Sequence, residues 1–86
     1  MEALLGMSEC ARSRRDYRSA LRWLGRALDI DPLREDVHRT LMITYSKMGE
    51  KHLVARQYEM LRQHLRQEMG VLPSQETESL ARLLLN

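Results

Sequence analysis

Residues 15–32 constrain the fold of this chain more than any other stretch, because their apolar side chains recur with the period of a helix. The apolar positions on this helix face are Tyr17, Ala20, Leu21, Leu24, Ala27 and Leu28. Ala20 and Ala27 are small enough to let a neighbouring helix approach closely, and Leu24 fills the space between them. Asp31-Pro32 ends the helix, since proline lacks an amide hydrogen and disfavours helical geometry in the preceding residue.

The same period predicts helices over residues 2–13, 34–48 and 51–69, and a last helix for which Ser74 is a good N-cap. We expect Gly49 and Gly70 to end two of them in a left-handed conformation, with Val71 and Leu72 making the apolar contact that often follows such a glycine. The side chains expected to pack are Leu4, Leu5, Met7, Cys10, Ala11, Val37, Leu41, Tyr45, Met48, Val54, Tyr58, Leu61, Leu65, Met69, Thr77, Leu80, Ala81 and Leu84.

The chain contains an internal repeat. A shift of 34 residues places Arg15 on Gly49 and Asp16 on Glu50, and it pairs Ala20 with Val54 and Ala27 with Leu61. This is the period of a tetratricopeptide repeat, whose helical hairpins stack into a right-handed superhelix. We therefore expect an all-α fold of about five helices in tetratricopeptide-like antiparallel hairpins. The expected units are a first hairpin over 1–32, a second hairpin over 33–70 and a closing helix over 71–86.

Composition narrows the class of protein. The 86 residues form one small domain, and the formal charge of +2 is too small to indicate a partner by itself. Cys10 is the only cysteine, so we expect no disulfide, a reducing cytoplasmic setting, and a buried, inert thiol. No apolar run reaches the ~20 residues that span a bilayer, so we expect no membrane partner. The six methionines are interpreted as core filler.

Several blocks in order make the resemblance to a known family specific. They are Asp31-Pro32-Leu33-Arg34-Glu35, His38, Leu41-Met42, Tyr45, Gly49, Gln57-Tyr58, Leu65, Met69-Gly70-Val71, Pro73-Ser74 and Glu76-Thr77. In these blocks the chain resembles the bacterial transcriptional activator domain. That family implies a bacterial, cytoplasmic regulator in which a winged-helix domain, absent here, contacts DNA. The family's domain is longer, so we expect this chain to be its C-terminal part, without the preceding helices.

The first helices of the two hairpins predict a concave groove, by analogy with tetratricopeptide repeats. The candidate groove residues are Leu5, Glu9, Arg12, Asp36, Arg39, Ile43, Ser46 and Lys47. Arg12, Arg39 and Lys47 would be able to hold an acidic peptide or another domain. The asparagines that hold a peptide backbone in chaperone-binding repeats are replaced by Glu9 and Ile43. The alternative is a groove covered by other domains of the parent protein.

Arginines form a candidate basic patch along the opposite face of the central helix: Arg15, Arg18, Arg22 and Arg26. They would suit nucleic-acid phosphates or an acidic partner, because clustered arginines attract both. The alternative is a solvated helix face. Trp23 lies beside this patch, and the sequence leaves open whether it is half-buried against the first helix or exposed to a partner.

Nothing in the sequence indicates catalysis. His38, His52 and His64 stand far apart without cysteine or paired carboxylates at ligand spacing, so we expect no metal, and His38 is expected to pack at a hairpin junction. No catalytic pair or phosphate-binding loop is present, so we expect neither an enzyme nor a cofactor. The sequence predicts a non-catalytic protein–protein interaction or oligomerisation module. Its partners would be other domains of the regulator, the transcription machinery, or a second copy through Leu4, Leu5 and Met7. The alternative function is sequence-nonspecific nucleic-acid binding through the basic patch.

Overall fold

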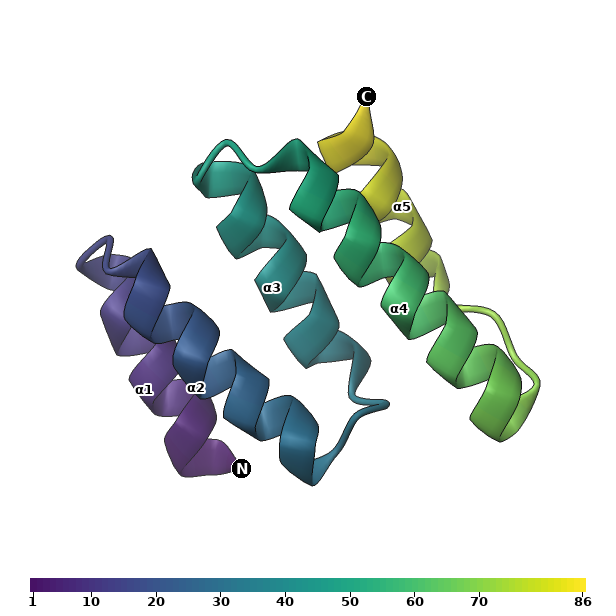
Figure 1. The fold of residues 1–86 in the computed structure, drawn as a ribbon, viewed down its shortest axis with the longest axis horizontal. Helices are drawn as coiled ribbons and strands as arrows, with labels where there is room; N and C mark the ends of the chain where they lie inside the picture. Colours follow the sequence, from purple (N-terminus) through teal and green to yellow (C-terminus); the bar gives the residue numbers. More distant parts are fainter.

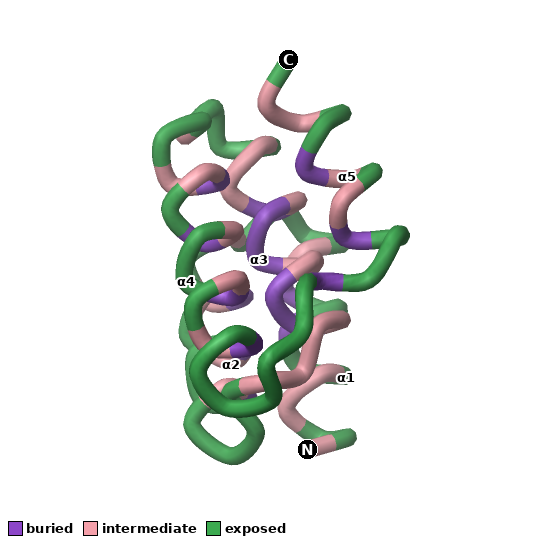
Figure 2. Tube along the Cα trace, turned by 90° about the vertical axis from the view of Figure 1, so that its right-hand side faces the viewer, coloured by how far each residue is buried: buried purple, intermediate pink, exposed green.

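The computed structural model describes residues 1–86 as five α-helices and no strands, so the predicted all-α fold is confirmed. The helices are α1 (Glu2–Ser13), α2 (Tyr17–Ile30), α3 (Glu35–Lys47), α4 (Lys51–Met69) and α5 (Gln75–Leu85). Consecutive helices run antiparallel and pack on one another (Figure 1). In Figure 2, α2 and α4 lie on one side of the molecule, α1 and α5 on the other, and α3 between them.

The two hairpin turns have the same backbone, as the 34-residue repeat predicts. Arg15 and Gly49 both adopt the left-handed conformation, with φ of 61° and 77°. In the first turn the Asp16 N–H donates to the Ala11 carbonyl at 2.8 Å, and the equivalent bond runs from Glu50 to Tyr45 at 2.9 Å. These bonds satisfy carbonyls at the helix end that would otherwise have no partner. The first turn achieves this with an arginine, a residue that rarely adopts this conformation.

The helix ends follow local signals with one exception. The predicted bounds 2–13 and 51–69 match α1 and α4, and Ser74 caps α5 by accepting a hydrogen bond from the Thr77 N–H at 3.3 Å. Gly70 is left-handed, with φ of 65°. The expected apolar contact of Val71 and Leu72 was wrong, because the two side chains are 46% and 69% exposed. The buried Pro73 carries the chain back onto the bundle instead.

The core lies along α3 in two clusters. One cluster joins α2 to α3 through Leu24, Ala27, Val37 and Leu41. The other joins α3 to both α4 and α5 through Met42, Val54 and Ala81. Tyr45 packs against both clusters, so its ring connects the two halves of the domain. Burial of apolar side chains is the main favourable term in folding, and both clusters bury theirs against α3.

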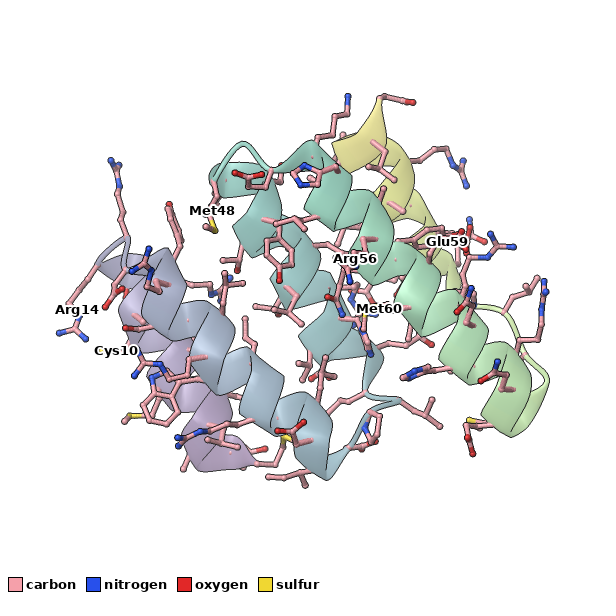
Figure 3. The ribbon with its side chains drawn as sticks, viewed as in Figure 1. Cys10, Arg14, Met48, Arg56, Glu59 and Met60 are labelled. Carbon is pink, nitrogen blue, oxygen red and sulfur yellow. The ribbon has the colours of Figure 1, made fainter.

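Two expectations about sulfur-containing side chains were wrong. Cys10 is exposed, because the buried positions of α1 are Ser8 and Ala11, and Cys10 falls on the other side of the helix (Figure 3). Of the methionines only Met42 is fully buried, whereas four are 40% to 61% exposed: Met7, Met48, Met60 and Met69. The methionines are therefore mostly surface residues and not core filler.

Candidate functional site

The concave side of the domain, formed by α1, α3 and α5, carries two adjoining pockets. The pocket between α1 and α3 has a volume of about 160 Å³ and reaches down to Leu24. The pocket between α3 and α5 has a volume of about 470 Å³. Asp36 and Thr40 line both pockets, so the two hollows adjoin at these side chains, and together they are called the groove. In Figure 2, α1 and α5 lie on one side of α3.

A polar network fastens the start of α5 to α3 and so shapes the larger pocket. The Glu35 carboxylate accepts hydrogen bonds from the Ser74 N–H at 2.9 Å and from the Thr77 hydroxyl at 2.7 Å. Arg39 donates to the same Thr77 hydroxyl oxygen at 2.9 Å and lies 3.7 Å from Glu76. Burial alone would raise the pKa of Glu35, but these hydrogen bonds outweigh it and hold the pKa below its usual value.

A second contact fastens α5 to α4. The Tyr58 hydroxyl donates to the Glu78 carboxylate at 2.6 Å. Burial of the phenol, together with this bond and the negative charge of Glu78, raises the pKa of Tyr58 to about 12. Because α5 is held by both neighbours at its first turns, its C-terminal half projects along the groove at a defined position.

The structure divides the predicted groove residues among three places. Leu5, Glu9 and Arg12 line the α1–α3 pocket with Asp36. Arg39 and Ile43 line the α3–α5 pocket, also with Asp36. Ser46 and Lys47, at the end of α3, lie outside both pockets.

The predicted basic side chains of the groove differ in how they are bonded. Arg39 is already engaged by Thr77 and Glu76, whereas Lys47 is exposed. The Arg12 Nε atom is buried and has no hydrogen-bond partner. Arg12 is therefore the groove cation with unsatisfied hydrogen-bonding capacity.

The sequence analysis missed the contribution of α5 to the groove. Glu76, Ser79, Leu80 and Leu83 form the far wall of the larger pocket, and Leu83 is 74% exposed. A local signal existed, because Leu83 stands outside the Thr77, Leu80, Ala81 and Leu84 pattern that packs α5 onto its neighbours. A leucine outside the packed stripe indicates an apolar surface that the domain does not use internally.

The predicted basic patch lies on the exposed side of the first hairpin. Arg18, Arg22 and Arg26 follow the exposed face of α2, and Arg15 stands in the preceding turn. None of the four makes an ion pair, whereas every ion pair of the structure lies between residues 34 and 76. The Arg26 guanidinium stacks over the Trp23 ring at 5.1 Å, and Trp23 itself is half-buried.

The buried histidine is a structural residue. His38 is 1% exposed, and its Nε2 atom lies 2.8 Å from the Pro32 carbonyl. Its Nδ1 atom lies 2.8 Å from the Gln57 amide nitrogen, so the neutral ring donates at one nitrogen and accepts at the other. Burial is the main cause that lowers the pKa of His38. The predicted position of His38 at a helix junction matches this arrangement, and no cluster of potential metal ligands forms around it.

Five helices in antiparallel pairs with a 34-residue period define a tetratricopeptide-like helical domain. A comparison with known families matches residues 1–85 to the family described as BTAD, bacterial transcriptional activator domain. The chain belongs to this family, and it is a non-catalytic regulatory domain of bacterial transcriptional activators. No curated protein and no solved structure matches the chain. No helix combines the length and apolar character needed to cross a membrane.

Proposed function

We propose that this domain is a protein–protein interaction module of its regulator, and that its concave groove binds a segment of a protein partner. The partner segment belongs to another domain of the same regulator or to the transcription machinery. DNA contact by the regulator then depends mainly on a DNA-binding domain that this chain does not contain. The domain acts through shape and charge complementarity and performs no chemistry.

The observation that carries the proposal is the apolar pocket between α3 and α5. Ile43, Leu80 and Leu83 line it together, and Leu83 exposes 74% of its surface. An exposed apolar side chain inside a pocket gains free energy when a partner side chain removes it from water. The network at Glu35 and Thr77 holds α5 in place, so the pocket is preformed and little ordering is needed on binding.

Arg12 indicates what kind of side chain the partner segment carries. Its buried Nε atom has no acceptor, and an unpaired buried donor costs about 1–3 kcal/mol. The Arg12 side chain is nevertheless partly exposed, lines the α1–α3 pocket and forms no ion pair, so a carboxylate from a bound segment would pair with its guanidinium there. We therefore propose a segment that places an apolar side chain at Leu83 and an acidic side chain at Arg12.

Selection of peptides from a displayed random library tests this function. Peptides that bind the domain should share an apolar and an acidic residue, and their affinities are measured by fluorescence anisotropy. Leu83→Ser should weaken binding about tenfold, a typical cost for a central apolar contact. Arg12→Gln should remove the preference for the acidic residue. The matched control is Arg82→Gln, which changes an exposed residue of the same helix outside the pocket. Selected peptides that bind the Leu83 and Arg12 variants as tightly as the parent would contradict the proposal.

Self-association is the alternative use of exposed apolar surface. Leu4 and Leu5, two of the residues expected to mediate it, pack partly against the first core cluster, whereas Met7 is 50% exposed. The surface around α1 is therefore smaller than the sequence suggested. Light scattering at high micromolar concentration distinguishes the two uses, because a homodimer through Leu83 would be lost in Leu83→Ser. A monomer at all concentrations would exclude the second copy as partner.

A further inference from the structure

The arginines of the first hairpin form no ion pair with any acid of the domain. We define the arginine surface as Arg14, Arg15, Arg18, Arg22 and Arg26, all of which are exposed and none of which forms an ion pair. Arg14 lies at the outer edge of the molecule, at the end of α1 (Figure 3). Asp16 is the acid closest to this surface in sequence, and its carboxylate caps α2 by accepting from the Ser19 N–H. A concentration of like charge on one helix destabilises it unless an anion is bound.

We propose that the arginine surface contacts the phosphate backbone of duplex DNA without reading its sequence. Arg18, Arg22 and Arg26 are each separated by four residues, so they follow one another about 6 Å apart along α2. A row of this kind extends about 12 Å, along which one DNA strand presents a phosphate every ~3.4 Å of helix axis. The arginine surface lies on the convex side of the domain, opposite the groove. Its contact with DNA therefore does not depend on binding in the groove.

Gly25 is a second observation at the same place. It lies within α2 between Arg22 and Arg26, is exposed, and would have no atom within 4 Å of an added Cβ. A glycine in the middle of a helix weakens it relative to alanine, and the packing of this domain does not require one. Its effect is to flatten the helix surface inside the arginine row. A flat surface lets a bulky backbone approach the guanidinium groups closely.

Duplex DNA fits this surface better than an acidic protein does. Protein interfaces are organised around apolar and aromatic side chains that become fully buried. The aromatic side chain here, Trp23, is half-buried and covered by Arg26. The exposed positions of α2 carry arginine, glycine and aspartate up to Asp29, and the one exposed apolar residue, Ile30, lies at the C-terminal end beyond the arginine row. Phosphate contacts need only cations, so the composition of this face matches the DNA backbone.

Anisotropy of a labelled duplex of arbitrary sequence tests the inference. The logarithm of the affinity should fall with the logarithm of salt concentration with a slope of about −3, because each phosphate contact contributes about −0.9. R18Q/R22Q/R26Q should lower the affinity at low salt by tenfold or more. The matched control, R56Q/R66Q/R82Q, removes the same charge from exposed arginines of α4 and α5 that form no ion pair. It should bind DNA nearly as tightly as the parent.

Gly25→Gln provides a test that leaves the charge unchanged. Its control is Gly6→Gln in α1, another exposed helical glycine with no atom near its Cβ position. Both substitutions should raise the melting temperature by a few degrees, since both replace a helical glycine. Only Gly25→Gln should weaken DNA binding, by about threefold or more, because only it raises the surface inside the arginine row. Equal DNA affinity of the two glutamine variants would overturn the close approach at Gly25.

Three further outcomes would overturn the proposal. The first is the absence of binding to the duplex at low salt. The second is an equal loss of affinity in the two triple variants, which would show an effect of net charge alone. The third is tighter binding to polyglutamate than to the duplex at equal charge concentration, which would assign the surface to an acidic protein. Circular dichroism of each variant confirms that the helices remain folded. Because Leu83 and Arg12 are unchanged in these variants, the result is independent of the groove.

Discussion

The two hairpins share a backbone plan but differ in how they use their side chains. The buried positions of α1 and α2 are mostly small: Ser8, Ala11, Ala20, Leu24 and Ala27. Those of α3 and α4 are larger, and they include the hydrogen-bonded His38 and Gln57. Every ion pair lies between residues 34 and 76, whereas the arginines of the first hairpin form none.

The two hairpins therefore contribute differently to stability and to binding. The second hairpin contributes to all four ion pairs and carries the centre of the core, including the α3 residues against which both α2 and α5 pack. The first hairpin packs closely through small residues and leaves its arginines without ion-pair partners and the Arg12 Nε atom without a hydrogen-bond partner. We infer that the second hairpin mainly determines stability, whereas the contacts of the domain are divided between the α3–α5 pocket and the free arginines of the first hairpin.

The largest expected loss of stability comes from shortening a buried side chain of the second hairpin. Leu61 is fully buried, so Leu61→Ala should lower the free energy of unfolding by about 2–5 kcal/mol through lost burial and a residual cavity. Urea denaturation followed by circular dichroism measures it. Leu72→Ala, at a side chain that is 69% exposed, is the control and should change stability little.

In the first hairpin, replacement of a small buried side chain by a larger one should be destabilising. Ala27 is fully buried between α2 and its neighbours, so Ala27→Leu should lower the free energy of unfolding by about 1–3 kcal/mol through overpacking. The exposed Ala3 offers a matched control, since Ala3→Leu adds the same atoms to α1 without meeting a packed surface. Equal effects of the two leucines in urea denaturation would contradict close packing of the first hairpin.

Acidification should destabilise the domain through His38. Its pKa is lowered mainly by burial, so the unfolded chain binds a proton more readily than the folded one. The stability is therefore fully present above the ordinary pKa of 6.5 and is lost as the pH falls through that value. His38→Gln should flatten the pH profile of unfolding between neutral pH and pH ~5.

The two turns predict opposite effects of exchanging their left-handed residues. Arg15→Gly should raise the free energy of unfolding by about 0.5–1 kcal/mol, because glycine adopts positive φ without steric cost. Gly49→Arg should lower it by a similar amount, since the backbone there has φ of 77°. Thermal unfolding of the two variants measures both. A loss of stability in Arg15→Gly would show that the arginine side chain, and not its backbone, stabilises the turn.

The smallest expected effect concerns surface charge. Arg62 donates to Glu59 at 2.9 Å, and both side chains are more than one-third exposed, so Arg62→Gln should cost only about 0.2–0.5 kcal/mol. Arg22 instead stands four residues from two other arginines, so Arg22→Gln should increase stability by a few tenths of a kcal/mol. Thermal unfolding at low and high salt checks the signs, since salt should reduce both differences. The same sign in both variants would contradict the contrast between the hairpins.

Features that depend on a few neighbouring residues were predictable from the sequence. The helix of residues 51–69, the cap at Ser74 and the left-handed glycines are set by periodicity and backbone chemistry within about one helical turn. The 34-residue shift even paired Arg15 with Gly49, although only the structure showed that the arginine has positive φ. The groove face of α1 and α3 was predicted by analogy with tetratricopeptide repeats.

Other features arise only when distant segments meet. The bonds of Thr77 to Arg39 and to Glu35 join residues 38 and 42 positions apart, and no local pattern indicates such pairs. The exposure of Cys10 also depends on packing between helices, because an apolar side chain is buried only where another helix covers it. Local chemistry determined the helices and their register in this protein. Packing of α5 against α3 decided which polar groups are satisfied, and therefore which side chains remain free to bind.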